Sequence, residues 1–371
     1  MSERHVDVVV VGAGPGGSTA ALESARRGLS TLLLDAKRLP RAKTCGGGVS
    51  PRGRGLLRRL GLWERVRSAS YPIEGIRLVA PSGRETVMVG AASAVVLPRS
   101  CLDEMLAREA VRAGAQLRDG LAARGLLSEA GQVVGVRTDE GDIRARWVIA
   151  ADGASARFST DPRPRRVLQT CMAWFEKVPF MPHVIEMIFD PELEPHYGWL
   201  FPEAADRVNI GICIQDERRE GRSIREVFQR FLDKYYAARL AGARQLGDWR
   251  GHPVLVTGSI RHLADPGVLL VGEACRLVNA TTGEGIAYAM ESGLLAAGAI
   301  ARGMRDDRDP VSVTRAYVRS LRFRLGLQLF VGDRVSRHGM GWLDHIVSLG
   351  RNPLFRRIAK QPAQLTLPGK A

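Results

Sequence analysis

Long apolar runs are missing from this chain of 371 residues, and their absence excludes a membrane-spanning helix. The longest apolar stretches, residues 6–11 and 268–271, have the length of strands. The first strand begins within a few residues of Met1, which leaves no room for a secretory signal. We therefore expect a protein of the cytoplasm.

Cysteine and lysine are both scarce. The five cysteines are scattered, without a C-x-x-C pair or a Cys/His cluster, so we expect neither disulfides nor a metal site. Only six of the 54 basic residues are lysine, so arginine carries most of the positive charge behind the net charge of +15. This balance favours either a solvated arginine-rich surface or attraction to anionic lipid or an anionic substrate. No aromatic–basic module for nucleic acid is present, so we expect no such partner.

The first 35 residues carry a nucleotide-binding pattern: an apolar run, a glycine-rich turn, a small-residue helix and a second apolar run that ends in Asp35. Gly12, Gly14 and Gly17 give the spacing G-x-G-x-x-G, which permits a tight turn, a close approach of a diphosphate and close helix–strand packing. Asp35 stands near the spacing of a carboxylate that binds a ribose hydroxyl. The alternative is a glycine-rich turn in another α/β protein. The predicted dinucleotide site comprises Gly12, Gly14, Pro15, Gly16, Gly17, Asp35 and Ala36.

Three later patches resemble flavoproteins of the aromatic-hydroxylase type. Arg99 and Asp103 match an R-x-x-x-D element, and Ser100 also has a capping-box spacing to Asp103 for a helix over 100–113. Residues 147–153 resemble the Asp-Gly motif of these proteins. Residues 269–274 resemble the Gly-Asp motif that holds the flavin ribityl chain, with a glutamate in place of the aspartate. The resemblance implies an FAD cofactor held in part by Arg99, Asp152, Gly153, Gly272 and Glu273.

Three further stretches narrow the resemblance to the geranylgeranyl reductases. Residues 279–286 match N-P-x-T-G-E-G-I except at Ala280, residues 43–48 resemble the K-x-C-G-x-G loop, and residues 197–202 match Y-x-W-x-F-P. A helix that starts after the glycines of the first stretch would turn its dipole toward the reduced flavin. Glu284 is either a site residue or a helix-end carboxylate only. The resemblance places near the flavin Cys45, Gly46, Gly47, Gly48, Gly283, Glu284, Gly285 and Ile286.

Tyr197, Trp199 and Phe201 fall on one face of a strand by simple alternation. They form either ordinary aromatic core or, as the resemblance implies, the wall of a long apolar substrate channel. The family reduces isoprenoid double bonds, and the implied catalytic residues are Cys45, Tyr197 and Trp199. A protonated alkene accepts a hydride, and a dry pocket with aromatic faces stabilises the cation. The proton donor stays open between Cys45, Tyr197 and a bound water.

A single G-x-G-x-x-G leaves no separate domain for NAD(P)H. Electrons would then come from transiently bound NAD(P)H, another reduced flavin or a carrier protein. The main rival interpretation is a monooxygenase of the aromatic-hydroxylase type that acts on an apolar small molecule. A halogenase fits less well, because no lysine occurs between residues 44 and 176, where its catalytic lysine is expected. A flavin-binding module without turnover is a third interpretation.

The order of the apolar runs predicts an α/β chain, α+β overall, in which a Rossmann-like FAD-binding domain is interleaved with a β-sheet substrate domain. The C-terminal tail is helical and basic. It either closes the substrate cavity or makes peripheral contact with a membrane, from which an apolar or lipid substrate is collected. The predicted segments are 1–70, 98–159 and 261–303 for the FAD domain, 71–97 and 160–260 for the substrate domain, and 304–371 for the tail.

Overall fold

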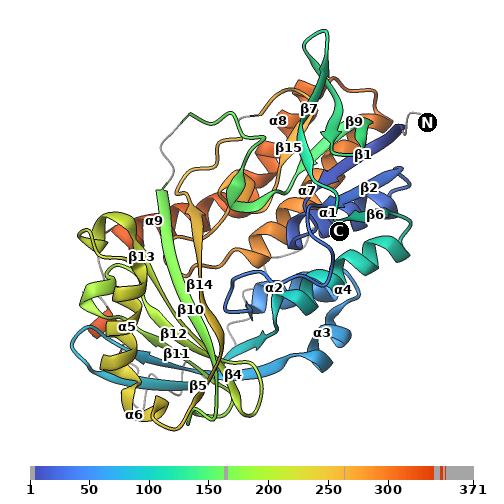
Figure 1. The fold of residues 1–371 in the computed structure, drawn as a ribbon. Coiled ribbons are helices and arrows are strands. Elements are labelled where there is room, and N and C mark those ends of the chain that lie inside the picture. Colours follow the sequence, from blue (N-terminus) through green and yellow to red (C-terminus); the bar gives the residue numbers. More distant parts are fainter. Residues whose placement is uncertain (1–4, 163–165, 263, 338–342, 346, 348–371) are drawn as a thin grey trace.

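The computed structural model describes residues 5–162, 166–262, 264–337, 343–345 and 347. Its strands form two sheets, which occupy opposite sides of the molecule in Figure 1. No helix in these ranges combines the length and the apolar character that crossing a bilayer requires.

The first sheet has seven strands in the order β6-β2-β1-β9-β8-β7, with β15 beside β9. Its centre is parallel, because β1 pairs in parallel with β2 and β9, and β15 pairs in parallel with β9. Strands buried on both faces read as continuous apolar runs, and the valines and leucines of β1 and β2 are of this kind. The strands are β1 (His5–Val11), β2 (Thr31–Asp35), β6 (Gln116–Asp119), β7 (Ala123–Glu129), β8 (Gln132–Thr138), β9 (Gly141–Ala150) and β15 (Val268–Leu270).

Three helices cover this sheet: α1 (Pro15–Arg26), α4 (Arg99–Arg112) and α7 (Ile286–Arg305). Helix α1 packs against both α4 and α7. The approach to α7 is so close that a Cβ atom added to Gly293 would lie 2.3 Å from the carbonyl oxygen of Gly16. The small residues of α7 therefore let the two helices touch through their backbones.

The second sheet has eight strands in the order β14-β10-β13-β12-β11-β4-β5-β3. Its pairs are antiparallel except for β11 and β4, which run in parallel. Helix α5 (Ile224–Tyr235), with the short α6 (Ala237–Leu240), packs on one face through a cluster that includes Phe228 and Phe231. The strands are β3 (Gly48–Val49), β4 (Tyr71–Val79), β5 (Glu85–Val96), β10 (Arg166–Glu176), β11 (Val184–Ile188), β12 (Gly198–Pro202), β13 (Arg207–Gln215) and β14 (Arg244–Val256).

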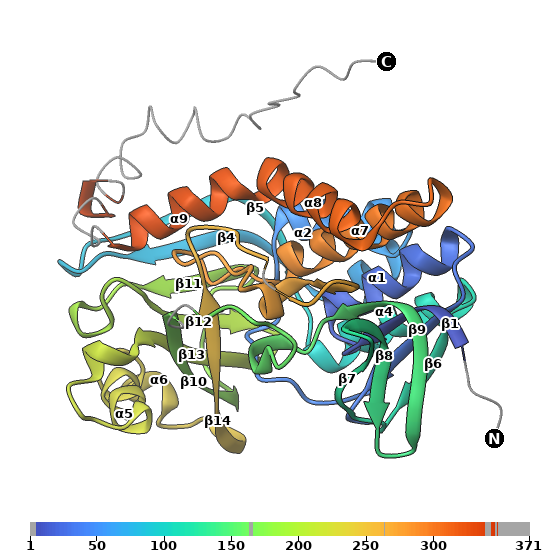
Figure 2. The ribbon, with the colours of Figure 1, turned by 90° about the horizontal axis from the view of Figure 1, so that it is seen from above.

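The C-terminal helices form a continuous arm of α8 (Pro310–Leu321), the π-helical turn η5 (Arg322–Gly326) and α9 (Leu327–Arg337). Figure 2 shows α8 and α9 along one edge of the molecule. The arm is fixed to both sheets, because Tyr317 donates a hydrogen bond to the Leu270 carbonyl at 2.7 Å and Asp333 forms an ion pair with Arg166. Helices α2 (Pro51–Arg59) and α3 (Trp63–Ala69) lie between β3 and β4 of the second sheet in the chain.

The predicted fold class is confirmed: a Rossmann-like parallel sheet is interleaved with a second sheet and followed by C-terminal helices. The first sheet takes its strands from residues 5–35, 116–150 and 268–270, and the second from residues 48–96 and 166–256. Of the predicted tail, only the part up to Arg337, with residues 343–345 and 347, lies within the described ranges.

The predicted capping box at Ser100 is wrong. Helix α4 begins at Arg99 after Pro98, and no side chain caps its N-terminus. The Asp103 carboxylate instead accepts hydrogen bonds from the guanidinium groups of Arg99 and Arg41. Charge-assisted contacts of this kind are about twice as strong as neutral ones, so they take the carboxylate away from the backbone.

Candidate active site

A cavity of about 800 Å³ runs from the glycine turn after β1 to the inner face of the second sheet. Its size is typical of a site for a small molecule or cofactor. Every residue predicted for the site lines this cavity except Gly17, which lies behind the glycine turn. Segments that are far apart in the sequence therefore meet around one space.

The glycine turn joins β1 to α1 and has no room for side chains. Gly12 has φ +105°, and a Cβ atom there would lie 2.4 Å from the Ala151 carbonyl oxygen. A Cβ atom on Gly17 would lie 1.8 Å from the Gly12 carbonyl oxygen. Gly14 caps α1 without a side-chain hydrogen bond, and Pro15 follows at the first helical position. The free N–H groups of this helix start make it a site for an anion.

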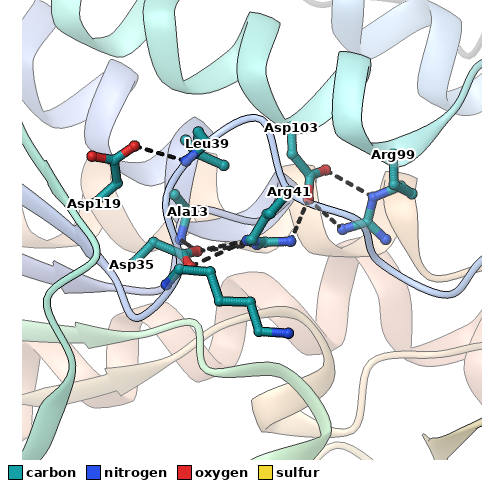
Figure 3. A network of polar contacts seen from close by, with 8 residues as sticks. Ala13, Asp35, Leu39, Arg41, Arg99, Asp103 and Asp119 are labelled. Atoms are coloured by element: carbon teal, nitrogen blue, oxygen red, sulfur yellow. Dashed lines mark hydrogen bonds and ion pairs between the residues drawn. The ribbon is translucent and has the colours of Figure 1, made fainter.

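The side chains of Arg41 and Arg99 lie beside this turn, as Figure 3 shows. Asp35 accepts a hydrogen bond from the Ala13 N–H at 2.9 Å, and Arg41 pairs with Asp35 at 3.0 Å and with Asp103 at 3.2 Å. The guanidinium of Arg99 makes a bidentate contact with Asp103 at 2.8 and 2.9 Å. Burial disfavours the charge of Arg99, but the Asp103 carboxylate outweighs it and raises the pKa of Arg99. Arg99 therefore stays charged beside the helix start.

Arg41 was not predicted from the sequence. An arginine in a loop after a nucleotide-binding strand has no periodic or motif signal, and its role appears only when the fold brings it beside Asp35. A Cβ atom on Gly14 would lie 3.9 Å from one Arg41 nitrogen and 3.8 Å from one Arg99 nitrogen. These distances place both guanidinium groups where a diphosphate at the turn would meet them.

Glu273 lies on the cavity wall directly after Gly272. Its Oε1 accepts a hydrogen bond from the Leu255 N–H of β14 at 3.0 Å, so the carboxylate also joins the first sheet's motif to the second sheet. Burial raises the pKa of Glu273, and the nearby charge of Lys43 opposes that shift. Burial lowers the pKa of Lys43 in turn. The two side chains thus share a poorly solvated part of the wall.

His252 of β14 is a further wall residue that the sequence did not reveal. Its Nε2 is buried and has no hydrogen-bond partner among the described residues. Burial, aided by the positive charges of Lys43 and Arg99, lowers the pKa of His252 to about 4. The imidazole is therefore neutral at pH 7. Only the pairing of β14 with β10 brings it to the cavity, and no motif marks it.

The glycine loop that carries Cys45 is pressed against the aromatic residues of β12. A Cβ atom on Gly46 would lie 2.9 Å from the Phe201 ring and 3.2 Å from Trp199 Nε1. Gly47 has φ +74°, and its N–H points to Cys45 Sγ at 3.4 Å. Arg99 also lies beside the Cys45 thiol. A side chain at Gly46 or Gly48 would meet the Phe201 ring, and one at Gly47 would meet the Leu97 carbonyl oxygen, so the loop needs its glycines.

Tyr197, Trp199 and Phe201 lie side by side on one face, as alternation predicts. The ring centroids are 6.3 Å apart for Tyr197 and Trp199, and 6.0 Å apart for Trp199 and Phe201. Trp199 Nε1 donates a hydrogen bond to Asn209 Oδ1 at 2.7 Å, which fixes the indole. The Tyr197 hydroxyl donates one to the Thr282 carbonyl at 2.5 Å. Burial raises the pKa of Tyr197, so this hydroxyl keeps its proton.

The second glycine turn, before α7, closes the cavity from the side of the first sheet. Gly283 has φ +65°, and Gly285 is the N-cap residue of α7 without a side-chain cap. The Glu284 carboxylate accepts a hydrogen bond from the Ser50 hydroxyl, which itself caps α2. Glu284 therefore joins the start of α2 to this turn and makes no cap on α7. Ile286 is the first residue of α7.

Asp152 and Gly153 follow β9 and line the cavity beside the first glycine turn. One carboxylate oxygen of Asp152 accepts a hydrogen bond from the Arg157 N–H at 2.7 Å. Gly153 has φ +67°, which suits glycine at the sharp turn after the strand. The backbone of Asp152 and Gly153 thus forms part of the cavity wall.

Comparisons with known proteins agree with this geometry. The family described as "FAD binding domain" matches residues 5–195, and the family described as "Geranylgeranyl reductase catalytic domain" matches residues 168–244. The chain is 32% identical over 324 residues to digeranylgeranylglycerophospholipid reductase 2 of Methanopyrus kandleri, covering 84% of this chain and 81% of that protein. It is 31% identical over 317 residues to digeranylgeranylglycerophospholipid reductase of Thermoplasma acidophilum, covering 78% and 76%.

Solved structures are similar over almost the whole chain. A geranylgeranyl bacteriochlorophyll reductase-like protein from Thermoplasma acidophilum has a TM-score of 0.85 at 26% identity and covers 96% of each chain. The flavin-dependent brominase Bmp2 has a TM-score of 0.80 at 22% identity, covering 96% of this chain and 92% of that one, which shows a shared fold alone. On the sequence matches, the chain belongs to the geranylgeranyl reductase family of FAD-dependent oxidoreductases.

Proposed function

We propose that the chain saturates carbon–carbon double bonds of an isoprenoid lipid, with FAD as its cofactor. The observation that carries the proposal is the contact between the Cys45 loop and the aromatic wall of β12, inside a cavity that continues from the dinucleotide turn. The curated relatives named above are digeranylgeranylglycerophospholipid reductases, which supports the choice of a reductase over a monooxygenase.

The residues around the cavity fit FAD. The turn at Gly12 and Gly17 excludes any Cβ atom and leaves the start of α1 open to a diphosphate, which Arg41 and Arg99 would neutralise. Asp35 would bind the ribose of the adenosine half, and Glu273 would bind the ribityl chain. The turn before α7 would hold the flavin ring. When bound and reduced, FAD supplies a hydride equivalent.

The aromatic wall would keep water away from the reacting alkene and stabilise positive charge that develops on it. Trp199 is suited to this role because Asn209 already satisfies its N–H group, so that the indole offers only its ring to the cavity. Phe201 and Gly46 pack against the same ring. A rigid, dry wall of this kind favours reduction of the cationic alkene over its capture by water.

We assign the proton that balances the hydride to Cys45 rather than to Tyr197. The Tyr197 hydroxyl is bound to the Thr282 carbonyl, and burial raises its pKa. The sulfur of Cys45 instead accepts the Gly47 N–H and lies beside Arg99, and both groups stabilise the thiolate that remains after proton transfer. The S–H proton goes to one alkene carbon and the hydride to the other. Solvent then returns a proton to the sulfur.

The electrons come from an outside donor in this proposal, either transiently bound NAD(P)H or a reduced carrier. The sequence has a single G-x-G-x-x-G turn, and in this proposal that turn binds FAD. No second dinucleotide turn is available in the sequence for a resident nicotinamide cofactor.

Anaerobic turnover of the FAD-loaded protein tests the proposal. After reduction with dithionite, geranylgeranyl compounds with and without a phospholipid head group should gain about 2 Da per double bond in the mass spectrum. Cys45→Ala should lower the rate by about a hundredfold or more with bound flavin unchanged, because a positioned acid contributes that much. Cys101→Ala, at an exposed cysteine, is the matched control. A gain of about 16 Da in air, without reduction under argon, would instead identify a monooxygenase.

A further inference from the structure

The outer face of the C-terminal arm carries large apolar side chains that the described part of the chain leaves in solvent. Phe323 is 87% exposed and Leu327 is 74% exposed, and Phe330 and Val331 are each 49% exposed. Most of the large hydrophobic residues that the structure leaves exposed lie on α8, η5 and α9. Contiguous exposed apolar groups on a folded protein mark a surface that contacts a partner.

The charge of this face is of one sign. Between Pro310 and Arg337 the sequence has a single acidic residue, Asp333. Asp333 is buried and forms ion pairs with Arg166 and Arg337, so it adds no negative charge to the outer face. The exposed basic residues of the arm are Arg315, Arg319, Arg322, Arg324, Arg334 and Arg337.

The spacing of these residues puts cationic and apolar groups on one line. Arg315, Arg319, Phe323, Leu327 and Val331 follow one another at intervals of four. Such a row drifts round a straight α-helix, which has 3.6 residues per turn. The wider π-helical turn of η5 takes up part of that drift and keeps the row on one side of the arm. The result is an arginine-flanked apolar stripe.

The inner side of the arm is fixed to the turn before α7. The Gln328 carbonyl accepts a hydrogen bond from Asn279 Nδ2 at 3.2 Å, and the Gly332 carbonyl accepts one from Thr281 Oγ1 at 2.6 Å. Leu325 and Leu329 of the same segment are fully buried. The arm therefore cannot rotate to hide Phe323 and Leu327 without breaking these contacts.

We propose that this stripe docks the protein on the surface of a lipid bilayer that contains anionic phospholipids. The aromatic and leucine side chains would enter the interface, and the arginines would bind the anionic head groups. The strength of such binding rises with the apolar area buried and with the attraction to anionic lipid. Docking is a separate property from the reductase activity and needs no turnover, so the two can fail independently.

Sedimentation of the FAD-loaded protein with vesicles tests the proposal. The wild type should pellet with phosphatidylcholine vesicles that contain phosphatidylglycerol and should stay in solution with phosphatidylcholine alone. Phe323→Ser combined with Leu327→Ser should weaken the partition at least about tenfold, because two large apolar groups no longer enter the interface. Val89→Ser combined with Val111→Ser, at exposed valines on β5 and α4, is the matched control and should pellet as the wild type does.

A charge variant and a fluorescence readout complete the test. Arg315→Gln combined with Arg319→Gln should weaken binding to the anionic vesicles and reduce its dependence on salt. Leu327→Trp, which keeps an apolar residue, should show a blue-shifted emission when anionic vesicles are added. Equal pelleting of the wild type and the Phe323/Leu327 variant overturns the proposal. So does a dimer in sedimentation velocity that the same variant dissociates, because the stripe would then contact a second copy of the chain.

Discussion

The hydroxyl of Tyr197 donates a hydrogen bond to the main-chain carbonyl of Thr282 across 2.5 Å. Tyr197 directly precedes β12 of the second sheet, and Thr282 belongs to the turn before α7, so this contact joins the aromatic wall to the turn that would hold the flavin ring. A Cβ atom on Gly283 would lie 3.4 Å from the same hydroxyl oxygen. This part-buried polar contact therefore links the two halves of the site.

Removal of this hydroxyl should loosen the turn before α7. Tyr197→Phe leaves the Thr282 carbonyl without this donor, and a hydrogen bond of this kind contributes about 0.5–1.5 kcal/mol. We expect a lower thermal midpoint and a faster release of FAD, measured by the recovery of free-flavin fluorescence. Tyr235→Phe removes a hydroxyl that bonds to Asp190, away from the cavity, and should change stability without changing FAD release. Equal release rates for the two variants would contradict this assignment.

The close packing behind the first glycine turn predicts a severe effect of a single methyl group. In Gly17→Ala the new Cβ atom would meet the Gly12 carbonyl oxygen at 1.8 Å, and backbone atoms cannot yield as a flexible side chain does. We expect protein that purifies without yellow flavin or that fails to fold. Gly55→Ala, in the exposed interior of α2 with no atom within 4 Å of the new Cβ, is the control and should be neutral or slightly stabilising. Yellow Gly17→Ala protein with wild-type stability would refute the packing argument.

The burial of Asp103 predicts that loss of its carboxylate costs more stability than loss of an exposed carboxylate. Asp103 has no exposed surface and pairs with both Arg99 and Arg41. Asp103→Asn leaves buried guanidinium charge without its partner, which costs about 3–5 kcal/mol. Asp139→Asn removes the exposed partner of Arg124 and should have little effect on stability, because a solvent-exposed ion pair contributes little. Urea unfolding of the two variants measures the difference, and similar losses would show that Asp103 does not carry the buried charge.

His196 predicts a loss of stability in mild acid. The side chain is buried, and desolvation, aided by the charge of Arg166, lowers its pKa from 6.5 to about 3. The unfolded chain therefore binds more protons than the folded chain between these two values, and stability falls as the pH falls through that window. The expected loss from this residue at about pH 5, relative to about pH 7.5, is on the order of 2 kcal/mol.

His196→Gln should flatten this acid dependence, because glutamine does not titrate and keeps a polar group near Gln215. Urea unfolding at both pH values gives the comparison, and His5→Gln, at an exposed histidine, should leave the dependence as it is in the wild type. If His196→Gln loses as much stability in acid as the wild type, the protons are taken up elsewhere. His252 and His262, whose pKa values burial lowers to about 4, are then the next candidates.

Local chemistry explains what the sequence could reveal. The turn at Gly12–Gly17 needs glycine because backbone atoms crowd it, and Gly283 needs it because of its positive φ of +65°; such needs leave a readable spacing. The aromatic row at 197, 199 and 201 follows from the two-residue period of a strand. These features depend on neighbours within a few residues, and the structure places them all around one cavity.

Register and long-range pairing explain what the sequence could not reveal. Asn209 reaches the Trp199 indole because β12 and β13 pair with Phe201 opposite Asn209. His252 reaches the cavity because β14 pairs with β10, and the parallel pairing of β11 with β4 joins segments about a hundred residues apart. Nothing in the local pattern specifies such partners. The wrong capping box at Ser100 has the same origin, because Arg41 comes to Asp103 from a distant loop.

The short strand β3 has a consequence for the thiol beside it. The chain leaves the first sheet at Asp35 and enters the second at Gly48, where it pairs with Val96 of β5. Cys45 thus lies on one of the segments that connect the two sheets, between Asp35 of β2 and Gly48 of β3. A hinge motion between the two sheets would move this segment, so the rate at which an alkylating reagent labels Cys45 reports how often the sheets separate.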